Sequence, residues 1–504
     1  MVESGLSAAE GSLLGAIDLG SNSFHLIIAR VEHGEIRPIH TLGERVQLGA
    51  GFERGRLAED AMARGLDCLT RFAQLLESVE ITGIRIVGTH ALRQAKNRRE
   101  FTDAAEAVLG APIDVVYGRE EARLIYLGVA HTLADDESSR LVVDIGGGST
   151  EFIVGQRFEP QRLVSLQLGC VSYAQQFFPE GGITAKNFRQ AYEHALLEVS
   201  HIRKHYQSQY WNEAVGASGT LQAIELLIQH AGWLESGIDR KSLEKLKKRL
   251  LKFQHADDID LEGLSDKRKH VIASGVAITM AIFDGLKIET MRTSKGALRE
   301  GVIYDLVGRL THEDVRERSI AAMLSRYGSD EGAAQSVSDR VTWLASSVAR
   351  TWNLKDQHIE LAAWAGRCHE IGVAISQKHH HHHSAYLIQN TDMPGFSQDE
   401  QEIMAVMLRG QQGKLPLDLL ENLPKKFHDS FTRLTALLRL AILFKWSESI
   451  ESIDDISVAA DKKRLIIYVP AGWRKTHPLT LWEIKKSKTI MSKLGVSVIV
   501  RNQR

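Results

Sequence analysis

The sequence repeats one short pattern, first as AIDLGSNSF at residues 16–24 and again as VVDIGGGSTEF at residues 142–152. In each copy an apolar run ends at an aspartate, and a turn of small polar residues leads into a second apolar run. This order predicts strand, turn, strand. Because glycine has no Cβ, such a turn lets backbone N–H groups and hydroxyls come close to an anion. Two copies predict a duplicated domain whose turns face one cleft.

The aspartates that open the two turns, Asp18 and Asp144, suggest a metal beside the anion. A carboxylate can hold Mg²⁺, usually through water, because this ion keeps several water ligands in proteins. Two such turns would hold a phosphate chain and its metal from both sides. The sequence contains no Walker A loop, GxxxxGK[ST], so the expected phosphate site is of another kind.

The composition is that of a globular protein with several domains. About 150 residues per domain would give three or four domains in 504 residues. The net charge of −1 excludes a global field that would draw the chain to nucleic acid or lipid. The three cysteines form no CxxC pair, residues 1–11 lack the features of a signal peptide, and the apolar stretch 271–283 is too short to span a bilayer. We therefore expect a cytoplasmic protein without a specific nucleic-acid partner, and a buried helix at 271–283.

Strand-like and helical patterns alternate along the first part of the chain, and helical patterns follow. The pattern predicts four domains: α/β lobes at residues 12–135 and 136–312, a helical domain at 313–450, and a small α+β domain at 451–504.

Five motifs in order resemble the exopolyphosphatase/guanosine pentaphosphate phosphohydrolase family. They are residues 16–24, GREEARLI at 118–125, residues 142–151, GASGT at 216–220 and GALREGV at 296–302. The resemblance covers nearly the whole chain. It implies an α/β fold of two actin-, Hsp70- and sugar-kinase-like (ribonuclease H-like) lobes, followed by an all-α HD-like domain and a small α+β C-terminal domain. Within the family, VGTHALRQ at 87–94 and HHSAYLIQN at 382–390 look closer to the exopolyphosphatase branch.

The resemblance also implies roles for individual residues. Glu121 matches the family's catalytic glutamate, which would orient or deprotonate the attacking water. Asp18, Asp144 and Glu151 match the carboxylates on the metal side. Arg93 matches an arginine that meets substrate phosphate, and further phosphate-binding groups are expected at Asn22, Ser23, Gly146, Gly147, Gly148, Ser149 and Gly219.

The residues alone leave plainer roles open. Glu120 and Glu121 would each favour a helix N-terminus by about 0.3–1 kcal/mol, and Glu120 is assigned that role only. The two aspartates would cap their turns, Glu151 would face solvent, and Arg93 would be an ordinary surface arginine.

Two histidine features lie in the helical region. His369-Glu370 resembles the His-Asp pair of HD phosphohydrolases, but glutamate replaces aspartate and no partner histidine is evident upstream. We therefore expect residues 315–450 to be HD-like in fold without HD chemistry. The five histidines at 379–383 run into a family motif, so we interpret them as native, with only adventitious metal binding.

Basic residues gather in two places. Residues 240–252 hold seven Lys or Arg and one acid, and the last 24 residues hold six and one. A solvated helix face is the plainer interpretation of the first cluster. The sharper one is a polyanion track that includes Arg240, Lys247 and Lys248. The basic tail is also the one feature that suggests peripheral membrane contact.

The leading prediction is an exopolyphosphatase that removes terminal phosphate from polyphosphate processively, with Mg²⁺ and with stimulation by a monovalent cation as a further expectation. The alternative is hydrolysis of the 5′-terminal phosphate of guanosine pentaphosphate by the same residues. A more remote alternative is a non-catalytic polyphosphate or nucleotide sensor. A sugar-kinase-like transferase is disfavoured because no base for an acceptor sugar is evident. The resemblance implies a homodimer.

Overall fold

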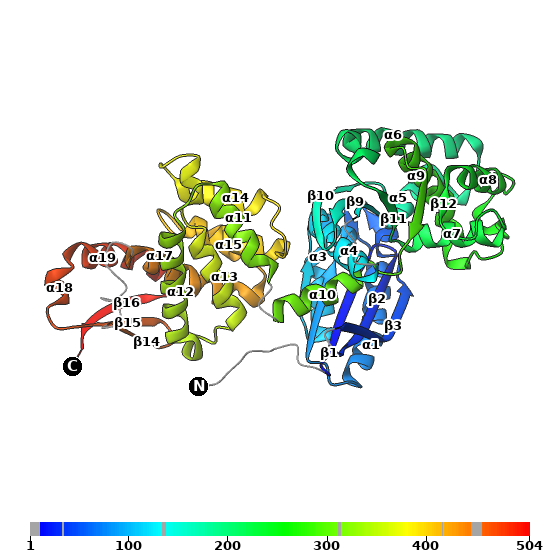
Figure 1. Ribbon diagram of the computed structural model, residues 1–504. Coiled ribbons are helices and arrows are strands. Elements are labelled where there is room, and N and C mark those ends of the chain that lie inside the picture. The colour runs from blue at the N-terminus through cyan, green and yellow to red at the C-terminus, as the bar shows by residue number, and fades with distance from the viewer. Residues whose placement is uncertain are drawn as a thin grey trace. The chain divides into compact units, whose positions relative to one another are not determined.

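The computed structural model describes residues 11–32, 35–133, 138–310, 314–415, 417–444 and 456–503. They belong to two compact units, Met1–Val315 and Arg316–Arg504, which are described separately (Figure 1). The three domain boundaries predicted from the sequence, at 135/136, 312/313 and 450/451, all lie outside the described residues.

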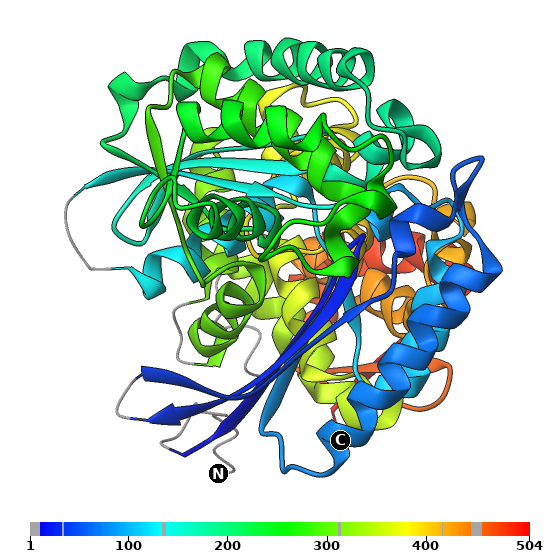
Figure 2. The same cartoon turned by 90° about the vertical axis from the view of Figure 1, so that its right-hand side faces the viewer.

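A five-stranded sheet forms the first half of the first unit. Its order is β3-β2-β1-β6-β7, with an antiparallel ribbon of three long strands followed by two parallel strands (Figure 2). The strands are β1 (Leu13–Leu19), β2 (Ser23–Glu32), β3 (Glu35–Arg45), β6 (Gly83–Gly88) and β7 (Ile113–Val115), and a small hairpin joins β4 (Phe52–Glu53) to β5 (Arg56–Leu57). Alternate residues of β2 enter different cores, since Leu26 and Ile28 lie in one and Ile27 and Ala29 in the other.

Helices cover both faces of this sheet. Leu69 and Phe72 of α1 (Glu59–Glu77) and Phe101 of α3 (Arg98–Leu109) fill the core on one face. Helices α4 (Gly118–Thr132) and α10 (Leu298–Leu310) fill the core on the other, and the short α2 (His90–Gln94) follows β6.

A second sheet repeats the plan of the first. Its order is β10-β9-β8-β11-β13-β12, again an antiparallel meander followed by parallel strands, with a short antiparallel strand added at the edge. The strands are β8 (Ser139–Ile145), β9 (Thr150–Gln156), β10 (Glu159–Leu166), β11 (Glu213–Gly216), β12 (Ile238–Asp239) and β13 (Thr290–Thr293). The helices are α5 (Cys170–Phe177), α6 (Ala185–Tyr206), α7 (Gly219–His230), α8 (Arg240–Leu250) and α9 (Lys269–Leu286). The predicted duplication of an α/β lobe is therefore confirmed.

Helix α9 contains the apolar stretch 271–283, and almost all of its side chains are buried in the core of the second lobe. The segment Asp266–Leu286, which includes this helix, is long and apolar enough to cross a membrane by length and composition alone. Most of that segment is buried inside the protein.

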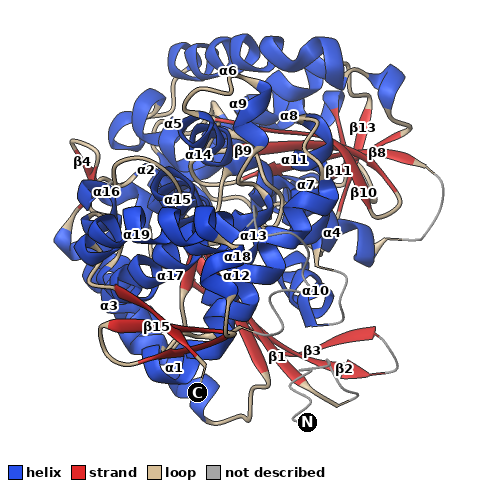
Figure 3. Cartoon of the chain, turned by 90° about the vertical axis from the view of Figure 1, so that its left-hand side faces the viewer, coloured by secondary structure: helices blue, strands red, loops and turns tan. Residues whose placement is uncertain are grey.

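The second unit is mainly helical, with one small sheet (Figure 3). Its helices are α11 (Val315–Arg326), α12 (Glu331–Trp352), α13 (Asp356–Arg367), α14 (His380–Asn390), α15 (Gln398–Gly410), α16 (Leu417–Glu421), α17 (Lys425–Leu443), α18 (Trp473–Thr476) and α19 (Pro478–Lys493). Strands β14 (Ser457–Ala460), β15 (Arg464–Val469) and β16 (Ser497–Asn502) form the sheet. The sheet shares one apolar core with the helices, and Trp352 Nε1 donates to the carbonyl of Asp461 at 2.7 Å.

His358 of α13 links the stability of this unit to pH. Its ring packs against Phe427 and Phe431, with centroids 5.7 and 5.0 Å away. Burial, with a smaller effect of Lys355, lowers its pKa to about 4. In the unfolded chain histidine titrates near 6.5. Between pH 6.5 and 4 this histidine is protonated in the unfolded state but not in the folded state. The free energy of unfolding therefore decreases as the pH is lowered through this range.

We expect the stability of the native protein to fall between pH 6.5 and 4, by at most about 1.4 kcal/mol per pH unit from this residue. His358→Phe should remove part of that slope, whereas the same change at the half-exposed His428 should leave it intact. Thermal unfolding across this pH range measures the slope, and an equal slope in native protein and His358→Phe would contradict the assignment.

Candidate functional site

The two turns predicted from the sequence line one cavity of about 250 Å³ in the first unit. The turns touch each other, because a Cβ added to Gly147 would lie 3.1 Å from Ser21 Cβ and 3.2 Å from the backbone N of Asn22. The wall comprises Asp18, Gly20, Ser21, Asn22, Ser23, His25, Thr89, His90, Glu121, Ile125, Asp144, Ile145, Gly146, Gly147, Gly148, Ser149, Cys170, Ala217, Ser218, Gly219, Thr220, Gln222, Arg268, Lys295, Ala297, Leu298 and Arg299.

The two hairpins place equivalent residues opposite their aspartates. On β1 and β2, Asp18 pairs with His25, and the imidazole Nδ1 lies 3.7 Å from Asp18 Oδ2. On β8 and β9, Asp144 pairs with Glu151 at the same register. The second hairpin thus carries a carboxylate where the first carries an imidazole, so negative charge gathers on the side of the second turn.

Glu121 lies in the first turn of α4 and reaches the cavity, although its side chain is buried. Arg93 Nη1 donates to Glu121 Oε2 at 3.0 Å and to the carbonyl of Val116 at 2.8 Å. Burial raises the pKa of Glu121, the charge of Asp18 raises it further, and Arg93 opposes both. This balance suits a base at neutral pH, because Arg93 favours the ionised form while burial makes it a stronger proton acceptor.

The two carboxylates of the second hairpin also resist ionisation. Burial and the charges of Glu121 and Asp18 raise the pKa of Asp144 to about 7. The pKa of Glu151 is also raised well above its usual range, by burial and then by Glu121 and Asp144. Ser165 Oγ donates to Glu151 Oε1 at 2.7 Å. Glu151 stands behind Asp144, since it is not among the residues of the cavity wall.

The donor set fits a hydrated divalent cation. Asp18 Oδ1 and Asn22 Oδ1 are buried atoms to which the described residues provide no hydrogen-bond partner. The neighbouring carboxylates repel one another, as the raised pKa of Asp144 shows, and a cation would relieve that repulsion. No group of three His, Cys, Asp or Glu side chains within the described ranges is arranged to ligate an ion directly. The arrangement therefore suits Mg²⁺, which keeps most of its water ligands.

His90, at the start of α2, lies against the glycine turn of the second hairpin. A Cβ on Gly148 would fall far inside van der Waals contact with its ring. Burial, helped by Arg93, lowers the pKa of His90 to about 4. The imidazole is therefore neutral at neutral pH and can serve as a hydrogen-bonding group at the cavity wall.

Three cationic residues of the cavity were missed by sequence reasoning. Arg268, which precedes α9, places its guanidinium against Gly219, where an added Cβ would have to displace it. Lys295 and Arg299 flank the N-terminus of α10. The last two lie in or beside the family motif at 296–302 and could have been flagged by it. Arg268 stands among ordinary lysines and arginines, and no pattern distinguishes it.

The structure brings most predicted site residues to the cavity, and the exceptions have physical reasons. Arg93 lies behind Glu121 and not in the wall. Glu120, assigned only a helix-terminal role, is buried and paired with Arg123.

The predicted polyanion track lies on α8, outside the wall of this cavity. Arg240 Nε contacts Asp284 Oδ1 at 2.7 Å, and Lys247 lies 3.6 Å from Glu244 while its ammonium faces the ring of Phe188. Lys248 shares the helix. Arg240 and Lys247 therefore already form contacts with acidic residues of this lobe.

In the His369-Glu370 pair of the helical unit, His369 is buried and makes backbone contacts, whereas Glu370 is partly exposed. His369 Nδ1 lies 2.8 Å from the carbonyl of Gly366, and the carbonyl of His369 accepts from Ser384 and Gln411. Four of the five histidines at 379–383 begin α14.

The chain matches two family models and several characterised relatives. The Ppx/GppA phosphatase family model matches residues 27–310, and the model for Ppx/GppA phosphatase domain III matches residues 315–488. The guanosine-5′-triphosphate,3′-diphosphate pyrophosphatase of Vibrio cholerae is 37% identical over 497 residues, 97% of this chain and 98% of that protein. The protein of the same name from Photobacterium profundum is 35% identical over 492 residues, 97% of this chain and 98% of that protein.

Solved structures agree on the fold. A crystal structure of the Aquifex aeolicus member of the Ppx/GppA family has a TM-score of 0.51 and 26% identity, covering 60% of this chain and 98% of that one. An exopolyphosphatase from Cytophaga hutchinsonii has a TM-score of 0.55 and 24% identity, covering 59% and 98%, and shows the shared fold alone. The predicted fold class is confirmed.

The leading functional prediction, an exopolyphosphatase, was wrong, as was the assignment to that branch. Relatives at 35–37% identity over nearly the whole chain carry the name of the guanosine pentaphosphate enzyme. The motifs behind the error do not report the substrate. Thr89 and His90 line the cavity together with the two glycine-containing turns, and Ser384 within residues 382–390 bonds to Gly372 and His369 inside the helical unit.

Gly148 and His90 give a direct test of the anion site. Gly148→Ala should weaken the binding of pyrophosphate at least about tenfold, because the new methyl group displaces the imidazole. In a His90→Ala background the same change should have little further effect. The control is Gly182→Ala, where the nearest atom to the added Cβ is the Pro179 carbonyl at 3.5 Å. Titration calorimetry measures the affinity, and equal losses from Gly148→Ala in both backgrounds would refute the contact.

Proposed function

The chain belongs to the Ppx/GppA phosphatase family, and on that premise we propose that it hydrolyses the 5′-terminal phosphoanhydride of guanosine pentaphosphate. The products would be orthophosphate and guanosine tetraphosphate. The observation that carries the proposal is the buried Glu121, held by Arg93, in the wall of a cavity lined by the two glycine-containing turns. The names of the full-length relatives support this substrate over a polyphosphate chain.

The chemistry follows from the positions of the groups. The terminal phosphate would lie on the backbone amides of residues 146–149 and on Asn22 and Ser23, with Arg268 and Lys295 offsetting its charge. Glu121 would accept a proton from a water as that water attacks the terminal phosphorus in line. The bond from phosphorus to the bridging oxygen breaks, and guanosine tetraphosphate leaves with the electron pair. Arg93 keeps Glu121 oriented and ionised before the step.

Asp18 and Asp144 would hold Mg²⁺ through water, with Asn22 Oδ1 as a further oxygen and Glu151 adding charge from behind. When bound, the ion supplies charge neutralisation for the phosphoryl oxygens. Without it the cavity would present its carboxylates to a polyanionic substrate, which is unfavourable.

Glu121→Gln tests the proposed base. We expect the native protein to release one orthophosphate from each guanosine pentaphosphate, and Glu121→Gln to lower kcat by about 10²–10⁴ because it removes the general base. The matched control is Glu59→Gln, in the exposed first turn of α1. A coupled phosphate assay measures release. No release by the native protein would overturn the proposed substrate, and release that survives Glu121→Gln would overturn only the assigned base.

Removal of the metal should abolish turnover. With chelator present we expect activity to fall to background and to return on adding Mg²⁺. Asp144→Asn should raise the Mg²⁺ concentration needed for half-maximal rate at least about tenfold, because a charged ligand becomes neutral. The control is Asp103→Asn, an exposed residue of α3. Full activity in chelator would contradict this assignment.

A further inference from the structure

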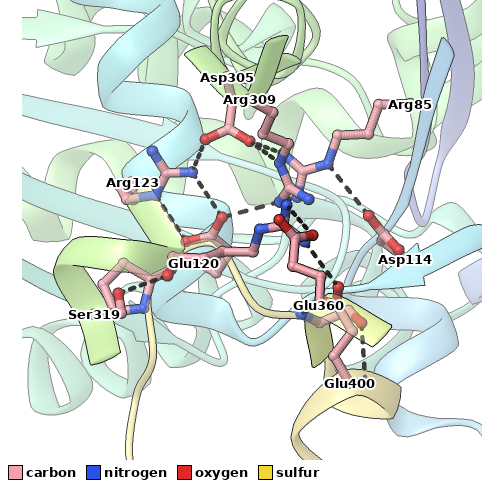
Figure 4. Close-up of polar contacts among 12 residues, drawn as sticks. Arg85, Asp114, Glu120, Arg123, Asp305, Arg309, Ser319, Glu360 and Glu400 are labelled. Carbon is pink, nitrogen blue, oxygen red and sulfur yellow. Dashed lines mark hydrogen bonds and ion pairs between the residues drawn. The ribbon is translucent and has the colours of Figure 1, made fainter. Parts of the chain in front are cut away.

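A buried ion-pair network joins three elements of the first lobe (Figure 4). Asp305 of α10 accepts hydrogen bonds from Arg85 of β6 and Arg123 of α4, and Arg309 Nε donates to it at 2.9 Å. Arg123 in turn holds Glu120 through two bonds of 2.8 Å. The carboxylate of Asp305 thus faces three guanidiniums from three different elements.

Each of the three elements also delivers groups to the cavity. Strand β6 leads into Thr89 and His90, and α2 then carries Arg93. Helix α4 carries Glu121, the neighbour of Glu120. Helix α10 follows Lys295 and begins beside Arg299, and it arrives directly from β13 of the second lobe. Asp305 therefore binds α4, which carries the proposed base, and β6, which leads into the helix of Arg93, from the helix that follows Lys295.

Helices α4 and α10 are packed in close backbone contact next to this network. A Cβ on Gly301 would overlap the carbonyl of Leu124, and a Cβ on Gly128 would overlap that of Ala297, so the helices meet backbone to backbone. The side chains of Arg85, Glu120 and Asp305 are each at most 5% exposed, so water cannot substitute for a lost partner. A change at Asp305 must be absorbed by movement of these helices.

We propose that Asp305 is a positioning residue that fixes Glu121 and Arg93 against the phosphate turns, so that its loss lowers kcat and leaves KM nearly unchanged. The inference rests on the proposed function for its kinetic readout. The expected difference between the effects on kcat and on KM follows from which elements carry the hydrogen-bond partners of Asp305. The partners of Asp305 lie on β6, α4 and α10, which adjoin His90 and Lys295. The two turns that would hold the phosphate follow β1 and β8, and neither strand carries one of those partners. Substrate would still bind, while the base would be misplaced, and small misplacements cost large factors in rate.

The test compares Asp305→Asn with Asp114→Asn. Both changes are chemically identical and both remove a partner of Arg85, but Asp114 lies on β7 and its side chain is a quarter exposed. For guanosine pentaphosphate we expect Asp305→Asn to lower kcat about 10²-fold, with KM changed less than about threefold and a cooperative thermal transition retained. Asp114→Asn should change neither constant more than about threefold. A folded Asp305→Asn with native kcat, or a loss confined to KM, would overturn the proposal.

Glu120→Gln is the second variant, and it tests the positioning role of Asp305 if Asp305→Asn does not fold. Glu120 holds Arg123, the residue of α4 that donates to Asp305, through two hydrogen bonds. The amide oxygen of the variant accepts one bond, so Arg123 is held less firmly toward Asp305 and we expect the same loss of kcat with KM preserved. A native kcat for a folded Glu120→Gln would then overturn the proposal.

An exchange measurement separates failure of this proposal from failure of the proposed substrate. In amide hydrogen exchange, Asp305→Asn, or Glu120→Gln in its place, should speed exchange in residues 118–124 and leave the turn at 144–151 unchanged. This readout needs no substrate. The exchange result would stand on its own even if the native protein released no phosphate from guanosine pentaphosphate. Unchanged exchange at 118–124 would refute the positioning role of Asp305, and faster exchange confined to 118–124 would support it.

Discussion

The crowding of carboxylates around one cavity is the constraint on which the rest of the site depends. Asp18, Glu121, Asp144 and Glu151 belong to three different strands and a helix. Burial, and then the charges of neighbouring carboxylates, raise the pKa of Glu121, Asp144 and Glu151. Such a cluster is stable only if cations lie nearby. Arg93 supplies one beside Glu121, and Arg268 and Lys295 line the same cavity. The same balance would suit the proposed phosphate substrate and its metal.

The duplicated fold explains how residues so far apart in sequence share this cavity. Each sheet ends its first strand at an aspartate and turns through small residues, so two copies place two anion-binding turns in contact. The chain then crosses between the lobes, and α4 and α10 pack side by side on the first sheet (Figure 1). One of these helices carries Glu121, the proposed base, and the other begins at the cavity, so their glycine-mediated contact and the buried Asp305 would belong to the proposed catalytic geometry.

Much of this could be predicted from the sequence, because repeated motifs report local backbone shape. The two turns, the helix that carries Glu121 and the buried α9 follow from strand, glycine and apolar patterns. Glu120 shows the limit of such patterns. Next to Glu121 it looks like a solvent-facing helix start, with Arg123 as an ordinary partner three residues along the same helix. Only the arrival of Arg85 and Asp305 from distant segments makes it part of a buried network. Arg268 and His90 were missed for the same reason. The error over the substrate arose because the distinguishing motifs form the phosphate wall and the helical core, and neither reports what is attached to the phosphate.

The central claim is that water, held at Glu121, attacks the terminal phosphorus of guanosine pentaphosphate. Turnover in water enriched in ¹⁸O tests this most directly, with mass spectrometry of both products. The account predicts one solvent oxygen in the released orthophosphate and none in guanosine tetraphosphate, because the broken bond is the one between the terminal phosphorus and the bridging oxygen. Label in guanosine tetraphosphate, or the absence of turnover, would contradict it.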